Sequence, residues 1–332
     1  MNICVFGIGG VGGSVGGMLC GKLHEREDYR VHFIARGNHR KAILENGLEL
    51  KLPDQRVICC RPSGVYPSLR EAPVPDAVLL CVKAYDLPLV TEELSDIGNP
   101  DMMVIPVMNG FDIYQRVRKN LKTGLVFPSC IYIGGRKTGD GECNFYFSGP
   151  LVYGADPMRK DHRPEKLITL LDEIIDKTYL DVKWVEDPYP AIWQKYMFNV
   201  AVNLMNAYTG KTLGEIMADA ALKQMTRDIL HETVEVIKRT PDAPVFPDAE
   251  GRIWEIIEKA PASTKSAYAV DIENHSRRNE GEIFGRAIIE LGRKAGAETR
   301  RIEEVFGEIE TRLSGEQEGW RINIPGASLS LG

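Results

Sequence analysis

The sequence lacks a long hydrophobic run, since its first apolar stretch, residues 3–6, is followed at once by glycine. A membrane-spanning helix needs roughly 20 apolar residues, and a secretory signal begins with a basic segment. We therefore expect neither a targeting segment nor a membrane span. Clustered basic residues are also missing: 41 Lys and Arg stand against 47 Asp and Glu, for a formal net charge of -6. Because nucleic-acid backbones are bound by clustered Lys and Arg, we expect no nucleic-acid partner.

Residues that bind metals or form disulfides are few and scattered. The seven cysteines include adjacent Cys59 and Cys60 but show no metal-ligand spacing, and the six histidines form no i, i+4 pair. Cys4 and Cys81 lie in apolar runs, where cysteine behaves as a small hydrophobic residue. No Gly-x-Ser-x-Gly nucleophile elbow is present. We predict no metal site, and a protein of the reducing cytoplasm.

The first half of the chain alternates strand and helix patterns, as expected of a mostly parallel sheet. Continuous apolar runs predict strands that are buried on both faces. These runs cover residues 2–6, 31–35, 77–82 and 103–108. A helix of small residues is expected at 11–22, and the glycines and aromatics of 124–154 predict hairpins that close the domain.

From about Pro188, long helical patterns replace this alternation and are separated by prolines, which break helices. They predict helices at 191–205, 213–239, 249–259, 266–275, 280–295 and 302–313. A chain of 332 residues is long enough for two domains with separate cores. The predicted fold is therefore α/β, with a Rossmann-type doubly wound sheet in residues 1–186 and an all-helical domain in residues 187–332.

A glycine loop with the pattern G-x-G-x-x-G follows the first strand and opens the first helix, which is the context of a dinucleotide-binding loop. Gly7 would make the turn, Gly9 would let a pyrophosphate approach the backbone, and Gly12 would let helix and strand pack. The helix N-terminus offers free N–H groups to the phosphates. A tight turn without a ligand is the alternative. The predicted cofactor contacts are Gly7, Ile8, Gly9, Gly10, Val11 and Gly12.

The end of the second strand distinguishes NAD from NADP. A site for NAD places Asp or Glu there to accept from the ribose 2′-hydroxyl, whereas this chain has Arg36. A guanidinium pairs with a 2′-phosphate, so we predict NADP(H) as the cofactor; a solvated arginine is the alternative. Lys83 and Asn109 follow two further strands, at the carboxyl ends where ligands of open α/β sheets bind. Each either contacts cofactor or substrate, or only marks where a strand meets water.

Three polar residues, Lys195, Asn199 and Asn203, repeat every four positions on the otherwise apolar segment 191–205. They line one helical face, which is either a narrow solvent face or the floor of a binding cleft. A partly desolvated lysine has a lowered pKa and suits proton transfer near neutral pH. The pattern favours reduction of a carbonyl group by hydride, with Lys195 protonating the carbonyl oxygen and the two asparagines holding the substrate.

These features together resemble the ketopantoate reductase (2-dehydropantoate 2-reductase) family. The matching segments are the glycine loop, 81–85, 108–110, the polar stripe within 193–203, and Asp271 with Glu280. They span nearly the whole chain, and the stripe is the most specific of them. The resemblance implies a two-domain enzyme that reduces a 2-oxo acid with NADPH on the route to pantothenate.

By position, the resemblance also implies a general acid, two substrate ligands and three cofactor contacts: Lys195; Asn199 and Asn203; and Arg36, Lys83 and Asn109. Asn109 would meet the substrate as well. Glu280 would contact cofactor or substrate, although Asn279 could instead cap a helix whose first turn carries Glu280.

The substrate side departs from the family pattern. A serine that contacts the substrate carboxylate in the family has three candidates here, Ser263, Thr264 and Ser266; we favour Ser266, for which a helix N-cap is the competing role. Leu213 stands where the family often has asparagine. The reaction type therefore follows more directly from the resemblance than the identity of the 2-oxo acid.

Two other functions stay open. An enzyme of the same architecture could reduce a different 2-oxo acid or form an opine-type secondary amine, and a non-enzymatic NADP sensor would bind the cofactor without catalysis. Retention of Lys195 on an intact stripe argues against the sensor, because cofactor binding alone does not need it. The expected partner is a small 2-oxo acid, and the helical domain has enough apolar surface for a homodimer.

Overall fold

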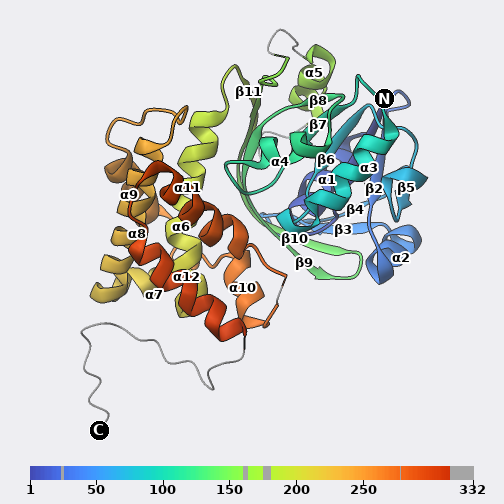
Figure 1. The fold of residues 1–332 in the computed structure, drawn as a ribbon. Coiled ribbons are helices and arrows are strands. Elements are labelled where there is room, and N and C mark those ends of the chain that lie inside the picture. The colour runs from blue at the N-terminus through green and yellow to red at the C-terminus, as the bar shows by residue number, and fades with distance from the viewer. Residues whose placement is uncertain (24–25, 160–163, 175–180, 277, 315–332) are drawn as a thin grey trace. The chain divides into compact units, whose positions relative to one another are not determined.

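A computed structural model of the chain describes residues 1–23, 26–159, 164–174, 181–276 and 278–314 (Figure 1). The chain divides into two compact units, Met1–Ile192 and Trp193–Gly332, here called unit 1 and unit 2. The division falls in the first turn of helix α6 (Tyr189–Thr209), a few residues after the boundary expected from the sequence.

Unit 1 contains a six-stranded parallel sheet in the order β5-β2-β1-β6-β7-β8. Counted along the chain within this sheet, the order is 3-2-1-4-5-6, which is the doubly wound Rossmann arrangement. The predicted fold class is confirmed. The strands are β1 (Asn2–Phe6), β2 (Arg30–Ile34), β5 (Gly64–Tyr66), β6 (Ala77–Leu80), β7 (Met103–Pro106) and β8 (Leu125–Val126).

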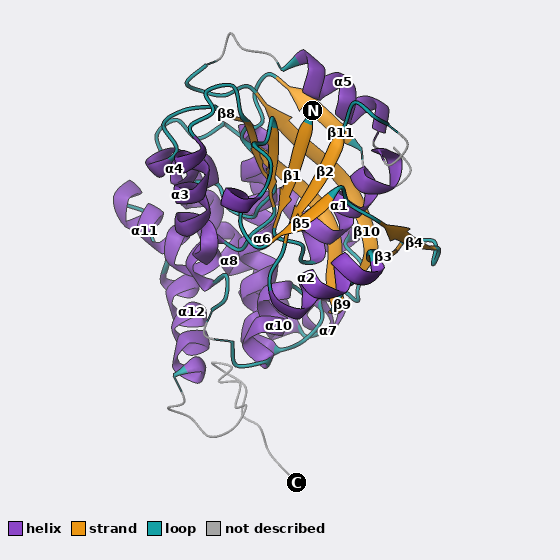
Figure 2. Cartoon of the chain, turned by 90° about the vertical axis from the view of Figure 1, so that its right-hand side faces the viewer, coloured by secondary structure: helices purple, strands orange, loops and turns teal. Residues whose placement is uncertain are grey.

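A second sheet lies in the same unit and has the order β11-β10-β3-β4, with β9 paired to β10 (Figure 2). The antiparallel pairing of β9 with β10 is the hairpin expected within 124–154. The other three strands of this sheet are short and were not foreseen. The strands are β3 (Leu48–Lys51), β4 (Val57–Cys60), β9 (Ser129–Gly139), β10 (Glu142–Gly154) and β11 (Val182–Val185).

Helix α1 (Gly10–Leu23) packs against strands of both sheets, which explains its small residues. A Cβ atom on Gly16 would lie 3.1 Å from the Phe33 ring of the first sheet. A Cβ atom on Gly17 would lie 2.9 Å from Leu50 of the second sheet. The glycines in the body of this helix therefore serve close packing on two sides, independently of any ligand at its first turn.

The remaining helices of unit 1 follow strands of the first sheet, except the last, which lies between β10 and β11 of the second sheet. Helix α3 packs on α4 and on the short η1. Strands β6 and β7 each end two residues short of the end of the apolar run that predicted them, so Lys83 and Asn109 lie in the loops that follow the strands. The helices are α2 (Gly37–Asn46), η1 (Leu69–Glu71), η2 (Ala84–Asp86), α3 (Leu87–Ile97), α4 (Ile113–Asn120) and α5 (Glu165–Ile174).

The described residues of unit 2 form helices without strands, as predicted. Helix α8 packs against α7, α9, α11 and α12. The segment predicted as one helix at 213–239 is divided at Asp219, whose carboxylate accepts from the N–H groups of Ala221 and Leu222 and caps α8. The elements are α6 (Tyr189–Thr209), α7 (Leu213–Ala218), α8 (Ala220–Arg239), α9 (Ala249–Lys259), α10 (Ala267–Glu273), a π-helical turn (Glu282–Arg286), α11 (Ala287–Ala295) and α12 (Arg300–Leu313).

The seven cysteines form no disulfide. Cys4 is fully buried, and burial raises the pKa of its thiol to about 12, in keeping with a hydrophobic role. In the part of the chain that the structure describes, no helix is long and apolar enough to cross a membrane. The same residues include no group of three side chains placed to hold a metal ion.

Candidate active site

The carboxyl ends of four parallel strands form one row in unit 1. Ile34 pairs with Phe6, Phe6 with Leu80, and Leu80 with Pro106. Each cofactor residue or segment predicted in this unit follows one of these strand ends within three positions along the chain. They are the glycine loop, which starts at Gly7, and Arg36, Lys83 and Asn109. The structure therefore brings them to a single edge of the sheet, where ligands of open α/β sheets bind.

The glycine loop uses its three glycines differently. Gly7 has a φ of 92° and donates its N–H to the Ile34 carbonyl at 3.1 Å. A Cβ atom on Gly12 would overlap the carbonyl oxygen of Gly7, so the backbone itself requires glycine there. A Cβ atom on Gly9 would meet no atom within 4 Å. This open side of the loop is where a pyrophosphate would approach, so the loop fits a dinucleotide.

The hairpin of β9 and β10 supports the glycine loop from the other side. A Cβ atom on Gly10 would overlap the carbonyl of Gly135 in β9. Ser14 donates its hydroxyl to the Gly10 carbonyl at 2.7 Å, and Cys143 Sγ lies 3.5 Å from the same oxygen. Sequence reasoning missed Gly135 and Cys143, because no local pattern marks contacts between residues more than a hundred positions apart.

Arg36 stands directly before α2, and its side chain is 62% exposed. Its Nε donates to the Pro67 carbonyl at 3.2 Å, and its Nη2 lies 3.5 Å from Oε1 of Glu93. Arg40, one turn further on, donates its Nε to the Val65 carbonyl at 3.2 Å. The Arg36 guanidinium is thus anchored through one edge and open to solvent elsewhere, an arrangement that fits a 2′-phosphate.

Lys83 and Asn109 are both half-buried. Lys83 immediately precedes η2. Cys81, two positions before Lys83, donates its N–H to the carbonyl of Phe6 at 2.8 Å, and Phe6 directly precedes the glycine loop. Asn109 is followed by Gly110, whose φ of 124° lets the chain turn away from the sheet.

The polar stripe is the accessible face of an otherwise buried helix. Helix α6 is continuous over Tyr189–Thr209, so Lys195, Asn199 and Asn203 share one face. Lys195 and Asn203 are half-buried, and Asn199 is 9% exposed. From Trp193 to the end of the helix, the positions that are not buried are Gln194, Lys195, Phe198 and Asn203. The other positions from Trp193 to Thr209 are buried, as expected of an apolar helix.

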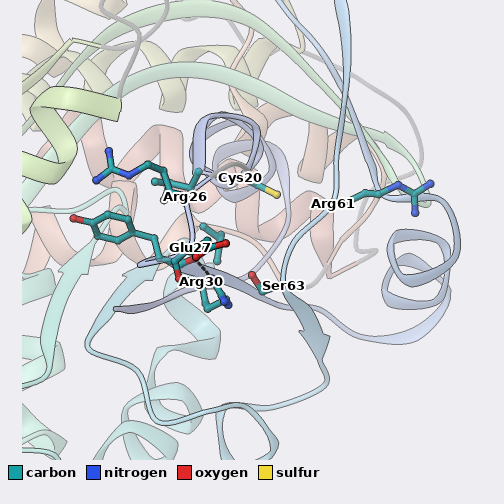
Figure 3. A pocket seen from close by; sticks show the side chains of 9 residues that line it. Cys20, Arg26, Glu27, Arg30, Arg61 and Ser63 are labelled. Carbon is teal, nitrogen blue, oxygen red and sulfur yellow. Dashed lines mark hydrogen bonds between the residues drawn. The ribbon is translucent and has the colours of Figure 1, made fainter.

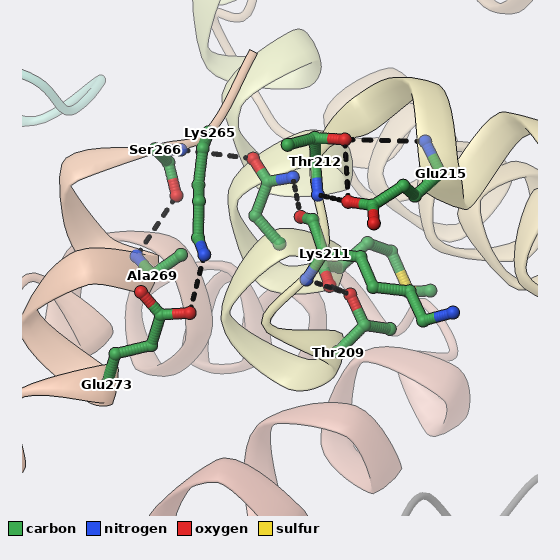
Figure 4. A network of polar contacts seen from close by, with 10 residues as sticks. Thr209, Lys211, Thr212, Glu215, Lys265, Ser266, Ala269 and Glu273 are labelled. Carbon is green, nitrogen blue, oxygen red and sulfur yellow. Dashed lines mark hydrogen bonds and ion pairs between the residues drawn. The ribbon is translucent and has the colours of Figure 1, made fainter. Parts of the chain in front are cut away.

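Ser266 is the N-cap of α10, the competing role weighed for it. Its hydroxyl oxygen accepts from the Ala269 N–H at 3.1 Å, and its own N–H donates to Oδ1 of Asn206 at 3.2 Å (Figure 4). Accepting a hydrogen bond leaves the hydroxyl hydrogen able to donate. The fully buried Asn206 also donates to the Lys211 carbonyl at 2.9 Å and so ties the end of α6 to the start of α10. Ser263 is exposed and Thr264 is half-buried.

Glu280 is 6% exposed, whereas Glu282, two positions on, is exposed. Asn279 accepts from the Gly281 N–H at 2.9 Å, so the capping contact weighed against a ligand role is present. A charge that only complements a helix start gains nothing from burial, because burial costs it its hydration. The burial of Glu280 therefore favours a contact beyond the helix dipole.

A surface pocket of about 410 Å³ lies in unit 1 near the amino end of β2, away from the strand ends that carry the predicted cofactor residues (Figure 3). Cys20 from the end of α1 and Val31 from the start of β2 line it, together with Arg26, Arg30 and Arg61. Arg26 pairs with Asp28 and Arg30 donates to two backbone carbonyls. None of the predicted site residues lines this pocket, and it is not part of the candidate site.

The fold and these residues define a class of protein. A Rossmann unit with a dinucleotide loop and a strand-end arginine, followed by a helical unit that presents a lysine and two asparagines, is the construction of a nicotinamide-dependent oxidoreductase. Residues 3–157 match the family described as "Ketopantoate reductase PanE/ApbA", and residues 188–312 match "Ketopantoate reductase PanE/ApbA C terminal". The chain belongs to the ketopantoate reductase family, oxidoreductases that act on 2-oxo acids with NADP(H) as cofactor.

The relatives of this chain have low sequence identity to it but match most of its length. An "Uncharacterized oxidoreductase YkpB" of Bacillus subtilis is 23% identical over 93% of this chain and 98% of its own length. A 2-dehydropantoate 2-reductase of Aquifex aeolicus is 22% identical over 72% of this chain and 77% of its own.

Solved structures show the same fold at similarly low sequence identity. A PanE/ApbA family ketopantoate reductase from Ralstonia eutropha has a TM-score of 0.82 at 22% identity and covers 96% of this chain and all of its own. A D-mandelate dehydrogenase with NADH and anilino(oxo)acetate has a TM-score of 0.81 at 19% identity, with coverages of 95% and 99%. A ketopantoate reductase from Staphylococcus aureus, described as dimeric, has a TM-score of 0.75 at 16% identity, with coverages of 96% and 100%.

Proposed function

We propose that this protein reduces 2-dehydropantoate (ketopantoate) to pantoate with NADPH, on the route to pantothenate, and that Lys195 is its general acid. The observation that supports the proposal most is the polar stripe on α6. Lys195 and Asn203 are half-buried on a helix that is mostly buried from Trp193 onward, with the buried Asn199 between them. A core helix keeps such a stripe when polar groups must meet a ligand.

The chemistry assigns a task to each residue of the stripe. When bound, the reduced nicotinamide supplies a hydride to the C2 carbonyl carbon. The Lys195 ammonium stabilises the negative charge that develops on the carbonyl oxygen and then donates a proton to it, which completes the hydroxyl group. The neutral amine regains a proton from water. Asn199 and Asn203 hold other oxygens of the substrate and fix its orientation.

The remaining predicted residues keep their proposed roles. The glycine loop holds the pyrophosphate, Arg36 the 2′-phosphate and Lys83 the cofactor ribose or phosphate. Asn109 bridges cofactor and substrate. Ser266 contacts the substrate carboxylate through its free hydroxyl hydrogen, and Glu280 contacts cofactor or substrate.

A different 2-oxo acid is the second candidate substrate. The D-mandelate dehydrogenase neighbour shares the fold, and its structure holds anilino(oxo)acetate. Leu213, at a position where the family often has asparagine, is 2% exposed and donates its N–H to the Thr264 carbonyl. It therefore supplies no polar side-chain group to a substrate.

The dimeric Staphylococcus aureus enzyme supports a homodimer for this chain.

The replacement of Lys195 by alanine separates an enzyme from an NADP sensor. We expect kcat for ketopantoate reduction to fall by roughly 10²- to 10⁴-fold, while the Kd for NADPH changes by no more than about twofold. Lys223→Ala is the matched control, since it removes a lysine of the same unit that pairs with Glu258 on the surface. Full turnover in Lys195→Ala would rule out the general acid. A wild-type protein that binds NADPH but turns over no 2-oxo acid would support the sensor.

A further inference from the structure

A buried carboxylate lies beside the arginine proposed for the 2′-phosphate. Glu93 belongs to α3 and is 6% exposed. Its Oε2 accepts from the Leu69 N–H at 2.9 Å, and its Oε1 lies 3.5 Å from Nη2 of Arg36. The local pattern of α3 gives no sign of this contact, because Glu93 and Arg36 are 57 positions apart in the chain.

The side-chain hydrogen bonds of this arginine and of its neighbour Arg40 are made to uncharged groups. The Nε groups of Arg36 and Arg40 both donate to backbone carbonyls, of Pro67 and Val65 respectively. In the described part of the chain, Glu93 is the one carboxylate within 4.0 Å of Arg36. Glu93 is therefore the group that offsets the charge of Arg36 when no phosphate is bound.

The contact between Glu93 and Arg36 is loose enough for another anion to replace Glu93 as the partner of Arg36. Its 3.5 Å exceeds the roughly 2.7–2.9 Å of a close charge-assisted hydrogen bond. The carboxylate is held by the Leu69 N–H, so it stays in place when the guanidinium turns to another anion. A phosphate monoester carries a charge of about -1.5 to -2 near neutral pH and would compete for Arg36.

We propose that Glu93 sets how strongly this protein prefers NADPH over NADH, by competing with the 2′-phosphate for Arg36. The proposal rests on the assignment of Arg36 to the 2′-phosphate made above. The negative charge of Glu93 repels the phosphate and partly neutralises its partner, and both effects weaken NADPH binding. NADH has a 2′-hydroxyl in place of the phosphate, so Glu93 leaves its binding unchanged.

The test is the isosteric substitution Glu93→Gln, with equilibrium binding of both cofactors measured by reduced-nicotinamide fluorescence on the full chain. Glutamine keeps the size of the side chain and an oxygen that accepts from Leu69, and it removes only the charge. We expect the Kd for NADPH to fall about fivefold and the Kd for NADH to stay within about twofold.

Asp96→Asn is the matched control. It removes a carboxylate one turn further along α3 that pairs with Arg70 and is 52% exposed, so it should leave the NADPH-to-NADH ratio unchanged. Weaker NADPH binding by Glu93→Gln would overturn the proposal, because Glu93 would then hold Arg36 ready for the phosphate. An unchanged ratio would overturn it as well.

Two further results keep the outcome clear. Should Glu93→Gln fail to fold, Glu93→Asp draws the carboxylate back by one methylene group, and tighter NADPH binding supports the proposal while unchanged or weaker binding overturns it. A wild-type protein that binds neither dinucleotide would overturn the cofactor assignment itself, and this result is distinguishable from an unchanged ratio in a variant that binds both.

Discussion

Tyr196 donates its hydroxyl to the carbonyl oxygen of Ile283 at 2.8 Å, across the core of unit 2. Tyr196 follows Lys195 on α6 and is 2% exposed, and Ile283 lies in the π-helical turn that begins two residues after Glu280. Turns of this kind occur often at functional sites. The hydrogen bond links the helix that carries Lys195 to the segment that carries Glu280.

We predict that Tyr196→Phe lowers the free energy of unfolding by about 1–3 kcal/mol, because it leaves a buried carbonyl without its partner. Urea denaturation of the full chain measures this change. Tyr146→Phe removes a hydroxyl from a side chain that is 57% exposed and should change stability by no more than about 0.5 kcal/mol. Equal effects of the two substitutions would contradict this account of the π-turn.

The glycine loop gives a second prediction, in which two of its glycines respond differently to substitution. Gly9→Ala should fold with nearly unchanged stability, since its Cβ meets no atom within 4 Å, yet lose roughly tenfold or more in NADPH affinity. Gly12→Ala should destabilise the fold, because its Cβ overlaps the Gly7 carbonyl. Thermal unfolding with and without NADPH measures both. A Gly9→Ala protein with wild-type NADPH affinity would show that the pyrophosphate lies elsewhere.

Asp156 gives a third prediction. This fully buried carboxylate accepts from the Tyr114 hydroxyl at 2.7 Å and the Val126 N–H at 3.0 Å, and it pairs with the buried Arg118. Asp156→Ala should cost about 3–5 kcal/mol, because it leaves the arginine buried without a counter-charge. The exposed Asp54, paired with Arg56, is the control, and its loss should cost far less, because solvent screens an exposed ion pair. Similar costs at both positions, in urea denaturation, would contradict the role given to burial.

His39 gives a prediction about pH. It is 8% exposed, and its Nδ1 accepts from the Gly141 N–H at 2.9 Å. Burial, aided by the charge of Lys137, lowers the pKa of His39 below its ordinary value of 6.5. At pH values between the folded and unfolded pKa of His39, the unfolded chain binds more protons than the folded chain does. The stability that the neutral His39 contributes is therefore complete above about pH 6.5 and is lost as the pH falls below it.

The melting temperature should therefore fall as the pH is lowered from about 7.5 to about 5.5, and the fall should be smaller in His39→Asn. The asparagine oxygen can still accept from Gly141, so the variant removes the titration and keeps the contact. Burial also lowers the pKa of His32, so part of the pH dependence should persist. An unchanged pH dependence in His39→Asn would show that His39 is not its source.

Local patterns predicted four of the six strands of the first sheet, β1, β2, β6 and β7, and the helices of unit 2, because each rests on its own periodicity. The short β5 and β8 were not predicted. The strand predicted at 2–6 is β1, with the same bounds, and the stripe of Lys195, Asn199 and Asn203 shares one face of α6. The second sheet escaped prediction in part because β3 and β4 are four residues each and alternate in burial without a long apolar run.

The contacts that distant segments make could not be predicted. Glu93 reaches Arg36, Gly135 closes on Gly10, and Asn206 holds Ser266, and none of these pairs is marked by spacing in the sequence. The π-turn depends likewise on tertiary packing, since a Cβ on Gly285 would overlap the Phe306 ring. Sequence patterns therefore predict which elements form and which side chains are chemically apt, while the structure adds how those side chains are held.

The central claim is tested most directly by following NADPH oxidation by the purified full-length protein, with ketopantoate beside a panel of other 2-oxo acids. We predict that kcat/KM is highest for ketopantoate and higher with NADPH than with NADH. Turnover of another 2-oxo acid alone would reassign the substrate and leave the role of Lys195 in place. The absence of turnover with every 2-oxo acid, in a protein that binds NADPH, would contradict the account.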